Sequence, residues 1–75
     1  MWKANFSDDL KNVVLDSDLK GTYYLNYTKG NDGVYLSKEH LLESGLNAFD
    51  LADIGSALES YNHNSQTHIY ISDNI

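Results

Sequence analysis

The stretch Asn47–Asn62, NAFDLADIGSALESYN, is the segment of this chain that is long and periodic enough to predict a helix. Its apolar residues recur every three or four positions and so share one helical face: Ala48, Leu51, Ile54, Leu58 and Tyr61. Asn47 suits the N-cap, and Asp50 in the first turn lies favourably against the positive end of the helix dipole. Gly55 destabilises a helix interior by up to about 1 kcal/mol relative to alanine. A close neighbour over Gly55 would explain its presence.

A second, shorter helix is predicted directly before this one. Ser37 suits the N-cap of KEHLLES, in which we expect Leu41 and Leu42 to point inward, and Gly45 occupies the usual stop position. The connection to the main helix is only about two or three residues long. We therefore expect the two helices to pack as a C-terminal helical hairpin.

Alternating apolar and polar residues predict strands at Met1–Phe6, Thr22–Thr28 and Thr67–Ser72. The turn Lys29–Gly33, KGNDG, should reverse the chain into Val34–Leu36 as an antiparallel hairpin. These elements predict an α+β fold in a single domain. We expect a small antiparallel sheet of three or four strands, packed on one face by the helical hairpin.

One segment has two competing interpretations. Ser7 followed by two aspartates predicts a short helix over Asp8–Leu15. The alternative is a strand through Asn12–Leu15, because Val-Val-Leu favours strands and the helix would have only about two turns. The residues Asp16–Gly21 that follow are typical of a turn.

Composition limits the function as well as the fold. Among 75 residues there are 11 acids, five lysines, no arginine and no cysteine, and the net charge is −6. Such a chain repels phosphate, so we expect no direct binding to nucleic acid or to an anionic membrane. A basic protein surface is the partner that this charge favours. With no apolar run of membrane-spanning length and no basic-then-apolar amino terminus, we expect a cytoplasmic protein.

No motif for catalysis, metal or cofactor binding is present. His40, His63 and His68 lack the spacing of a metal site, and without cysteine or a Gly-x-Ser-x-Gly turn no nucleophile stands out. The segment Asp16–Gly21 begins like a calcium loop, but Lys20 stands where an oxygen ligand is needed. We therefore predict no catalytic residues, no metal, no cofactor and no enzymatic activity.

Protein contact is the function that remains. The last lysine is Lys38, so the carboxylates of the two predicted helices could present a continuous negative surface: Glu39, Glu43, Asp50, Asp53 and Glu59. Tyrosines on an exposed sheet face could form a second contact surface: Tyr23, Tyr24, Tyr27, Tyr35 and Tyr70.

These features predict a small acidic protein-binding module. We expect it to inhibit or regulate a larger protein by occupying a basic surface, often one that binds nucleic acid. Its composition, rich in Asn, Tyr, Asp and Ile, resembles small accessory proteins of AT-rich mobile elements, including phage inhibitors of host enzymes. Anti-CRISPR and antirestriction proteins that act as nucleic-acid mimics in the host cytoplasm would be instances. The alternative is a tyrosine-rich assembly or regulatory module that acts as a homodimer.

Overall fold

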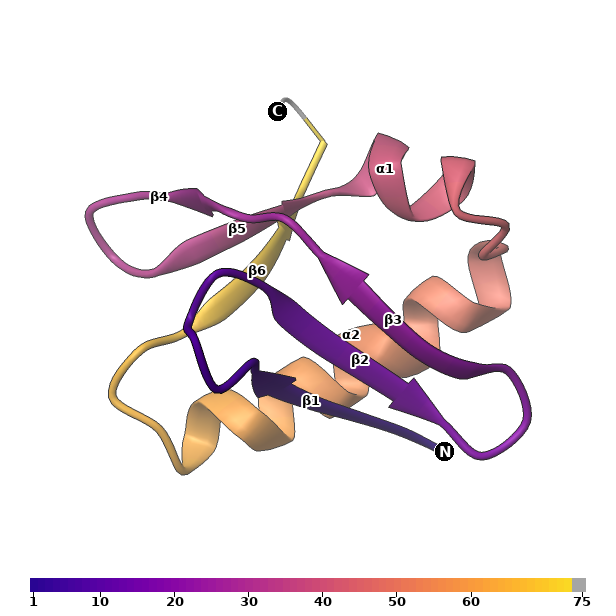
Figure 1. Ribbon diagram of the computed structural model, residues 1–75, viewed down its shortest axis with the longest axis horizontal. Helices are drawn as coiled ribbons and strands as arrows, with labels where there is room; N and C mark the ends of the chain where they lie inside the picture. The colour runs from indigo at the N-terminus through magenta and orange to yellow at the C-terminus, as the bar shows by residue number, and fades with distance from the viewer. Residues whose placement is uncertain (74–75) are drawn as a thin grey trace.

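Within residues 1–73, six strands form two small sheets, and the longer of two helices lies across them (Figure 1). The structure is a computed structural model, and it describes residues 1–73. The elements are β1 (Trp2–Phe6), β2 (Val13–Ser17), β3 (Gly21–Leu25), β4 (Thr28–Lys29), β5 (Val34–Ser37), α1 (Lys38–Glu43), α2 (Ala48–His63) and β6 (Ile69–Ser72). The predicted α+β class is confirmed. The predicted antiparallel sheet of three strands is present, but the strands of residues 1–73 also form a second sheet of three that the sequence did not predict.

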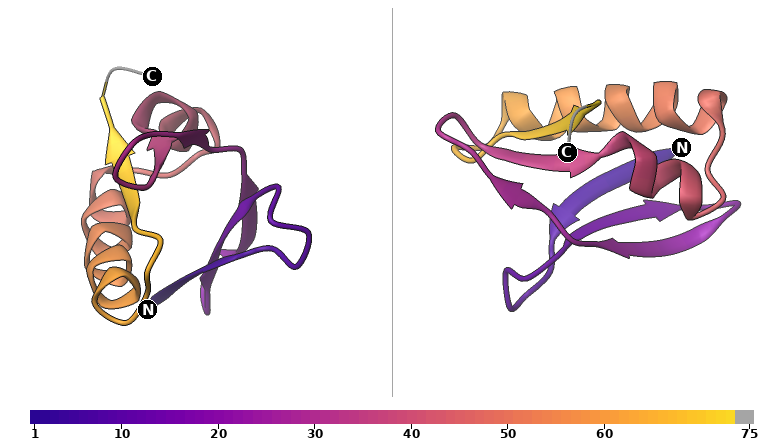
Figure 2. Two further views of the ribbon diagram at one scale, coloured as in Figure 1. Left: turned by 90° about the vertical axis from the view of Figure 1, so that its left-hand side faces the viewer. Right: turned by 90° about the horizontal axis from the view of Figure 1, so that it is seen from above.

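The first sheet is an antiparallel meander in the order β1-β2-β3. Its strands alternate as the sequence predicts for β1: Trp2 and Ala4 are buried, whereas Lys3 and Asn5 are exposed. Figure 2 shows this sheet on one side of the molecule and α2 on the other. The core lies between them.

The prediction of a helix over Asp8–Leu15 is wrong. The alternative, a strand through Asn12–Leu15, corresponds to the first part of β2, which covers Val13–Ser17. Residues 7–12 form a loop in which the Ser7 hydroxyl accepts the Asn12 backbone N–H at 3.0 Å. Leu10 has a φ of +61°, which no right-handed helix allows. Val13 and Leu15 are fully buried and lie in β2. The neighbouring strands β1 and β3 pair with the backbone of β2 on both sides.

The strand predicted over Thr22–Thr28 is divided at residues 26 and 27, so the segment serves both sheets. Its first part is β3, which pairs with β2, and its end is β4, which pairs with β5. The predicted antiparallel hairpin is confirmed for this short β4–β5 pair. Gly33 is required here, because a Cβ at this position would lie 2.4 Å from the His68 carbonyl oxygen.

The predicted closing strand is confirmed as β6, but it pairs with β5 in parallel. A parallel pair needs a crossover connection, and here α1 and α2 supply it. The Asn62 side chain of α2 completes β6: its amide donates to the Ile69 carbonyl at 2.9 Å and accepts the Ile69 N–H at 2.8 Å. The amide thus replaces a neighbouring strand along this part of the β6 edge.

The main helix forms where the sequence predicts it. Ile54 and Leu58 are buried against the sheets. Ala48, expected on the apolar stripe, is exposed because it precedes Ile54 by six residues and therefore lies about 120° away around the helix. Gly55 has no neighbour within 4 Å of the space that a Cβ would occupy, so close packing does not explain it.

The shorter helix α1 has the predicted start and end. The Ser37 hydroxyl accepts the His40 N–H at 3.3 Å, and Gly45 has a φ of +95° beyond the last turn. Leu41 is fully buried, but Leu42 is 46% exposed because neighbouring residues point about 100° apart on a helix.

The predicted helical hairpin is not the unit that packs on a sheet. α1 packs mainly against β5, whereas α2 packs against β1 and β6 (Figure 1). No helix among residues 1–73 combines the length and apolar character that crossing a membrane requires.

Candidate protein-binding surface

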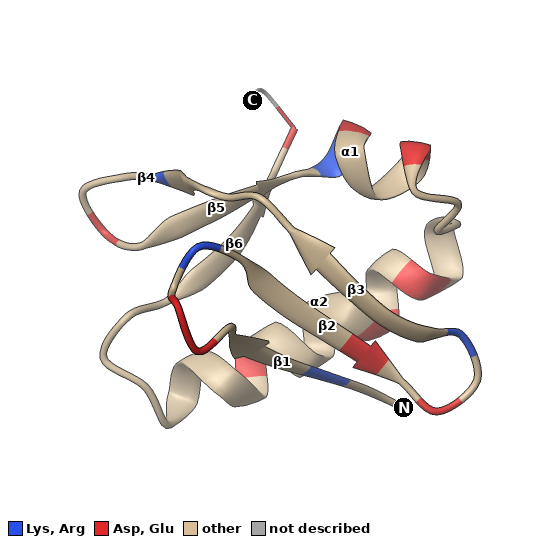
Figure 3. Ribbon diagram, in the orientation of Figure 1, with Lys and Arg blue, Asp and Glu red and all other residues tan. Residues whose placement is uncertain are grey.

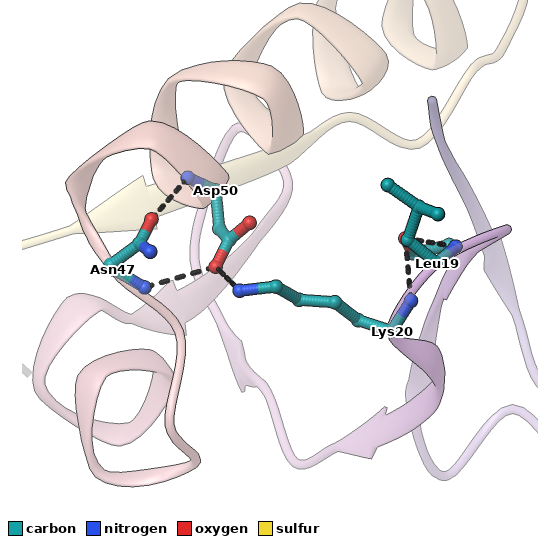
Figure 4. A network of polar contacts seen from close by, with 5 residues as sticks. Leu19, Lys20, Asn47 and Asp50 are labelled. Atoms are coloured by element: carbon teal, nitrogen blue, oxygen red, sulfur yellow. Dashed lines mark hydrogen bonds and ion pairs between the residues drawn. The ribbon is translucent and has the colours of Figure 1, made fainter.

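Asp50 belongs to the fold and not to the exposed acidic surface that the sequence suggests. Asp50 is only 8% exposed. One oxygen of its carboxylate accepts a hydrogen bond from the Lys20 ammonium at 2.5 Å and another from the Asn47 backbone N–H at 3.1 Å (Figure 4). The Asn47 side chain in turn accepts the Asp50 N–H at 2.9 Å, which completes a capping box. The hydrogen bond from Lys20, followed by that from Asn47, lowers the pKa of Asp50 below its ordinary value.

The β2–β3 turn positions Lys20 for this contact. The Ser17 hydroxyl accepts the backbone N–H groups of Leu19 and Lys20, each at 3.2 Å. The turn is thereby held in one shape, and Lys20 reaches the start of α2 across the molecule (Figure 4). Lys20 and Asp50 are thirty residues apart, so sequence spacing contains no signal for this ion pair.

The four remaining acids of the predicted surface are exposed: Glu39, Glu43, Asp53 and Glu59. The two ion pairs found among residues 1–73, Lys20 with Asp50 and Lys38 with Asp73, use none of them. Figure 3 shows acidic segments on α1 and on the first half of α2 at the same end of the molecule.

The negative surface is smaller than the sequence suggests. Glu39 and Glu43 lie one turn apart and share a face of α1. Asp53 and Glu59 are six residues apart, which turns them about 120° from each other around α2. With Asp50 neutralised by Lys20, the surface contracts to α1 and the beginning of α2.

Two large apolar side chains lie among these acids and were missed by sequence reasoning. Leu42 is 46% exposed on α1 beside Glu39 and Glu43, and Phe49 is 83% exposed in the first turn of α2. The signal for Phe49 was available, because it falls outside the apolar stripe of its helix. Exposed aromatic and aliphatic side chains are typical anchors of protein interfaces.

The tyrosines do not share one exposed face. Tyr23 packs against Trp2 with ring centroids 5.8 Å apart, and Tyr27 packs edge-on against Phe6 at 5.5 Å. The Tyr27 hydroxyl also donates to the Leu10 carbonyl. Tyr24 is 67% exposed and lies on the opposite face of the first sheet from Tyr23.

Tyr35 and Tyr70 form a separate pair on the outer face of the second sheet. They lie directly across from each other on β5 and β6, with ring centroids 5.3 Å apart. The Tyr35 hydroxyl donates to Asp32 at 2.5 Å, and this hydrogen bond raises the pKa of Tyr35 above its ordinary value. The Tyr70 hydroxyl is 3.0 Å from Nδ1 of His68.

Residues 1–73 contain no group of three or more His, Cys, Asp or Glu side chains placed to hold a metal ion. Comparisons of this chain with protein-family models, with curated proteins and with solved structures found no match. The exposed surface is therefore the feature of this molecule that bears on its function.

Proposed function

We propose that this protein is a small acidic binding module that inhibits or regulates a larger protein by covering a basic surface. The observation that supports this most directly is the set of exposed carboxylates on α1 and early α2 without a lysine partner among the described residues. Unpaired charges on one end of a molecule attract an oppositely charged surface and accelerate association.

The arrangement on α1 suits a contact that is more than electrostatic. The exposed side chain of Leu42 lies beside Glu39 and Glu43 on a short helix that Ser37 caps at its start and Gly45 ends. Protein interfaces commonly combine polar groups with apolar side chains in this way.

The partner surface that best complements these groups is one rich in lysine or arginine. Surfaces of this kind commonly bind nucleic-acid phosphates, so the acidic end of this protein would act there as a nucleic-acid mimic. An anti-CRISPR or antirestriction protein of a phage or mobile element is the role that we favour, with the cytoplasm of the host cell as its location.

The test is a pull-down from a lysate of the source cell or its host, with a matched charge control. Glu39→Lys with Glu43→Lys changes the net charge from −6 to −2, and Asp8→Lys with Asp18→Lys does the same on loops away from α1. We expect wild type and the loop variant to retain a partner with a basic groove at about 0.05 M salt, whereas the α1 variant should retain at least about tenfold less of it. A complex that survives about 0.5 M salt and the α1 changes would contradict the proposal.

A second candidate function is self-association through Tyr35 and Tyr70. The paired rings on the outer face of the second sheet favour it, because tyrosine offers apolar area with a polar end. Sedimentation at low and high salt distinguishes the two functions. A dimer that high salt preserves and Tyr70→Ala abolishes would support this candidate, whereas a monomer at both salt concentrations would exclude it.

A further inference from the structure

The turn between β4 and β5 contains the single place in the sequence where aspartate or asparagine precedes glycine, Asp32-Gly33. This turn lies at one end of the molecule (Figure 1). The Asp32 side chain is exposed, and the Gly30 N–H donates to the Gly33 carbonyl at 2.7 Å across the turn. The carboxyl group of Asp32 and the backbone nitrogen of Gly33 are therefore neighbours at the surface.

The backbone nitrogen of Gly33 is available for reaction. Within residues 1–73 its N–H donates no hydrogen bond, although the N–H groups of Gly30 and Val34 both do. Glycine is required at position 33, because its φ is +154° and a Cβ would lie 2.4 Å from the His68 carbonyl oxygen. The fold thus keeps here the one residue type that has no side chain to shield its nitrogen from the preceding carboxyl group.

The Asp32 carboxyl group is oriented by one contact and is otherwise open. The Tyr35 hydroxyl donates to its Oδ1 at 2.5 Å, and neither ion pair of the described residues involves Asp32. A hydrogen bond to one oxygen leaves the carboxyl carbon free for attack by the Gly33 nitrogen. Since both groups belong to adjacent residues, their encounter is intramolecular and needs no partner.

We propose that Asp32-Gly33 is a site of spontaneous isomerisation, at which aspartate becomes isoaspartate through a cyclic imide. The Gly33 nitrogen bonds to Cγ of Asp32, and one carboxyl oxygen leaves as water with the N–H proton and the carboxyl proton. A water molecule then adds to the imide and breaks the bond between this nitrogen and the Asp32 backbone carbonyl carbon. One water leaves and one returns, so the composition is unchanged.

The product has a different backbone at the turn. The peptide link now runs through Cβ and Cγ of residue 32, which lengthens the turn by one atom, and the former backbone carbonyl becomes a free carboxylate. Tyr35 thereby loses the acceptor that it has in the original turn. This reaction is independent of the acidic surface of α1 and of any partner, so it can fail or succeed without the proposed function.

The fold protects the pair that is most similar in chemistry, Asn64-Ser65. An asparagine before a small residue forms the same imide with loss of ammonia. Here, however, the Asn64 amide donates to the Ser60 carbonyl at 3.3 Å, and the Ser65 N–H donates to the Asn62 carbonyl at 3.4 Å. Both reacting groups are engaged at the end of α2. We therefore expect Asp32 to react in the folded protein and Asn64 to react only after unfolding.

The experiment stores the folded protein for weeks in water enriched in heavy oxygen, beside a sample unfolded in guanidinium chloride. Each passage through the imide places one heavy oxygen at residue 32, which peptide mass spectrometry locates, and a methyltransferase specific for isoaspartate quantifies the product. Labelling at Asp32 in the folded protein should be within about threefold of that in the unfolded chain, whereas conversion of Asn64 should be at least about tenfold slower in the folded protein.

Two substitutions test the mechanism. Asp32→Glu keeps the charge but needs a larger ring, so labelling at residue 32 should fall at least about tenfold. Asp32→Asn should react faster, because it reaches the same imide by losing ammonia from an uncharged amide. Three results would overturn the proposal: folded-state labelling at Asp32 no greater than at the exposed Asp8 and Asp18, labelling that persists in Asp32→Glu, or reaction of Asn64 ahead of Asp32 in the folded protein.

Discussion

Replacing Asn62 should destabilise the protein more than its position near a helix end suggests. Its side-chain amide makes two hydrogen bonds to the backbone of Ile69, a residue with no solvent exposure. In a parallel pair, the N–H and C=O groups of every second residue point away from the neighbouring strand, and Ile69 is one of these residues. Without the amide, the N–H and C=O of Ile69 lose their partners at a site that water reaches poorly.

The size of the effect follows from these two bonds. Each contributes about 0.5–1.5 kcal/mol net, and groups left unsatisfied add to the loss, so Asn62→Ala should cost about 2–3 kcal/mol. A domain of 75 residues has a total stability of about 4–11 kcal/mol. The melting temperature should therefore fall by roughly 8–24 °C.

Urea unfolding monitored by the fluorescence of Trp2, the single tryptophan, measures this loss because Trp2 is buried in the folded state. Asn62→Leu keeps a similar side-chain volume without the hydrogen bonds and should lose about as much as Asn62→Ala. Asn64→Ala, which removes an exposed contact to the Ser60 carbonyl, is the control and should change little. Wild-type stability of Asn62→Leu would show that packing, and not the paired amide, stabilises β6.

Three further predictions concern single positions. Gly55→Ala should raise the free energy of unfolding by about 0.5–1 kcal/mol, because the added methyl group meets no neighbour; chemical denaturation measures the gain, and any loss would contradict the open space. The lowered pKa of Asp50 means that its contribution to stability is present at neutral pH and is lost as the pH falls below about 4. Lys20→Met should therefore reduce the difference in stability between pH 7 and about pH 3, whereas Lys11→Met should preserve it; equal acid profiles would refute the pairing. Leu41→Ala should cost about 2–5 kcal/mol in the same denaturation assay, because Leu41 is fully buried beneath α1, and a loss below about 1 kcal/mol would show that α1 is loosely attached.

Local patterns predicted the elements whose causes are themselves local. The cap at Asn47, the cap at Ser37 and the stop at Gly45 depend on neighbours within four residues, and all three are present. The strand at β1 was visible as an alternation of exposed and buried side chains. Such features need no knowledge of the rest of the fold.

Contacts between distant segments were not predictable from these patterns. The division of Thr22–Thr28 into β3 and β4 depends on which neighbour each half finds, and the parallel partner of β6 follows only from the path of two helices. The Lys20–Asp50 ion pair is another contact between distant segments, and it changes the composition of the candidate surface. Spacing alone predicts that the Asp50 carboxylate faces solvent, but an ion pair with Lys20, thirty residues earlier, removes it from the exposed acidic surface.

The two strands that α2 packs against are treated differently at their edges. Along β6, Asn62 supplies a donor and an acceptor where a neighbouring strand would, so the chain itself satisfies that edge. Along β1 the helix presents Ser56 and Ser60, whose hydroxyls make no bond to the strand among the described residues. The same helix therefore satisfies one strand edge with a side-chain amide and leaves the other without one, because asparagine stands at position 62 and serines stand at positions 56 and 60.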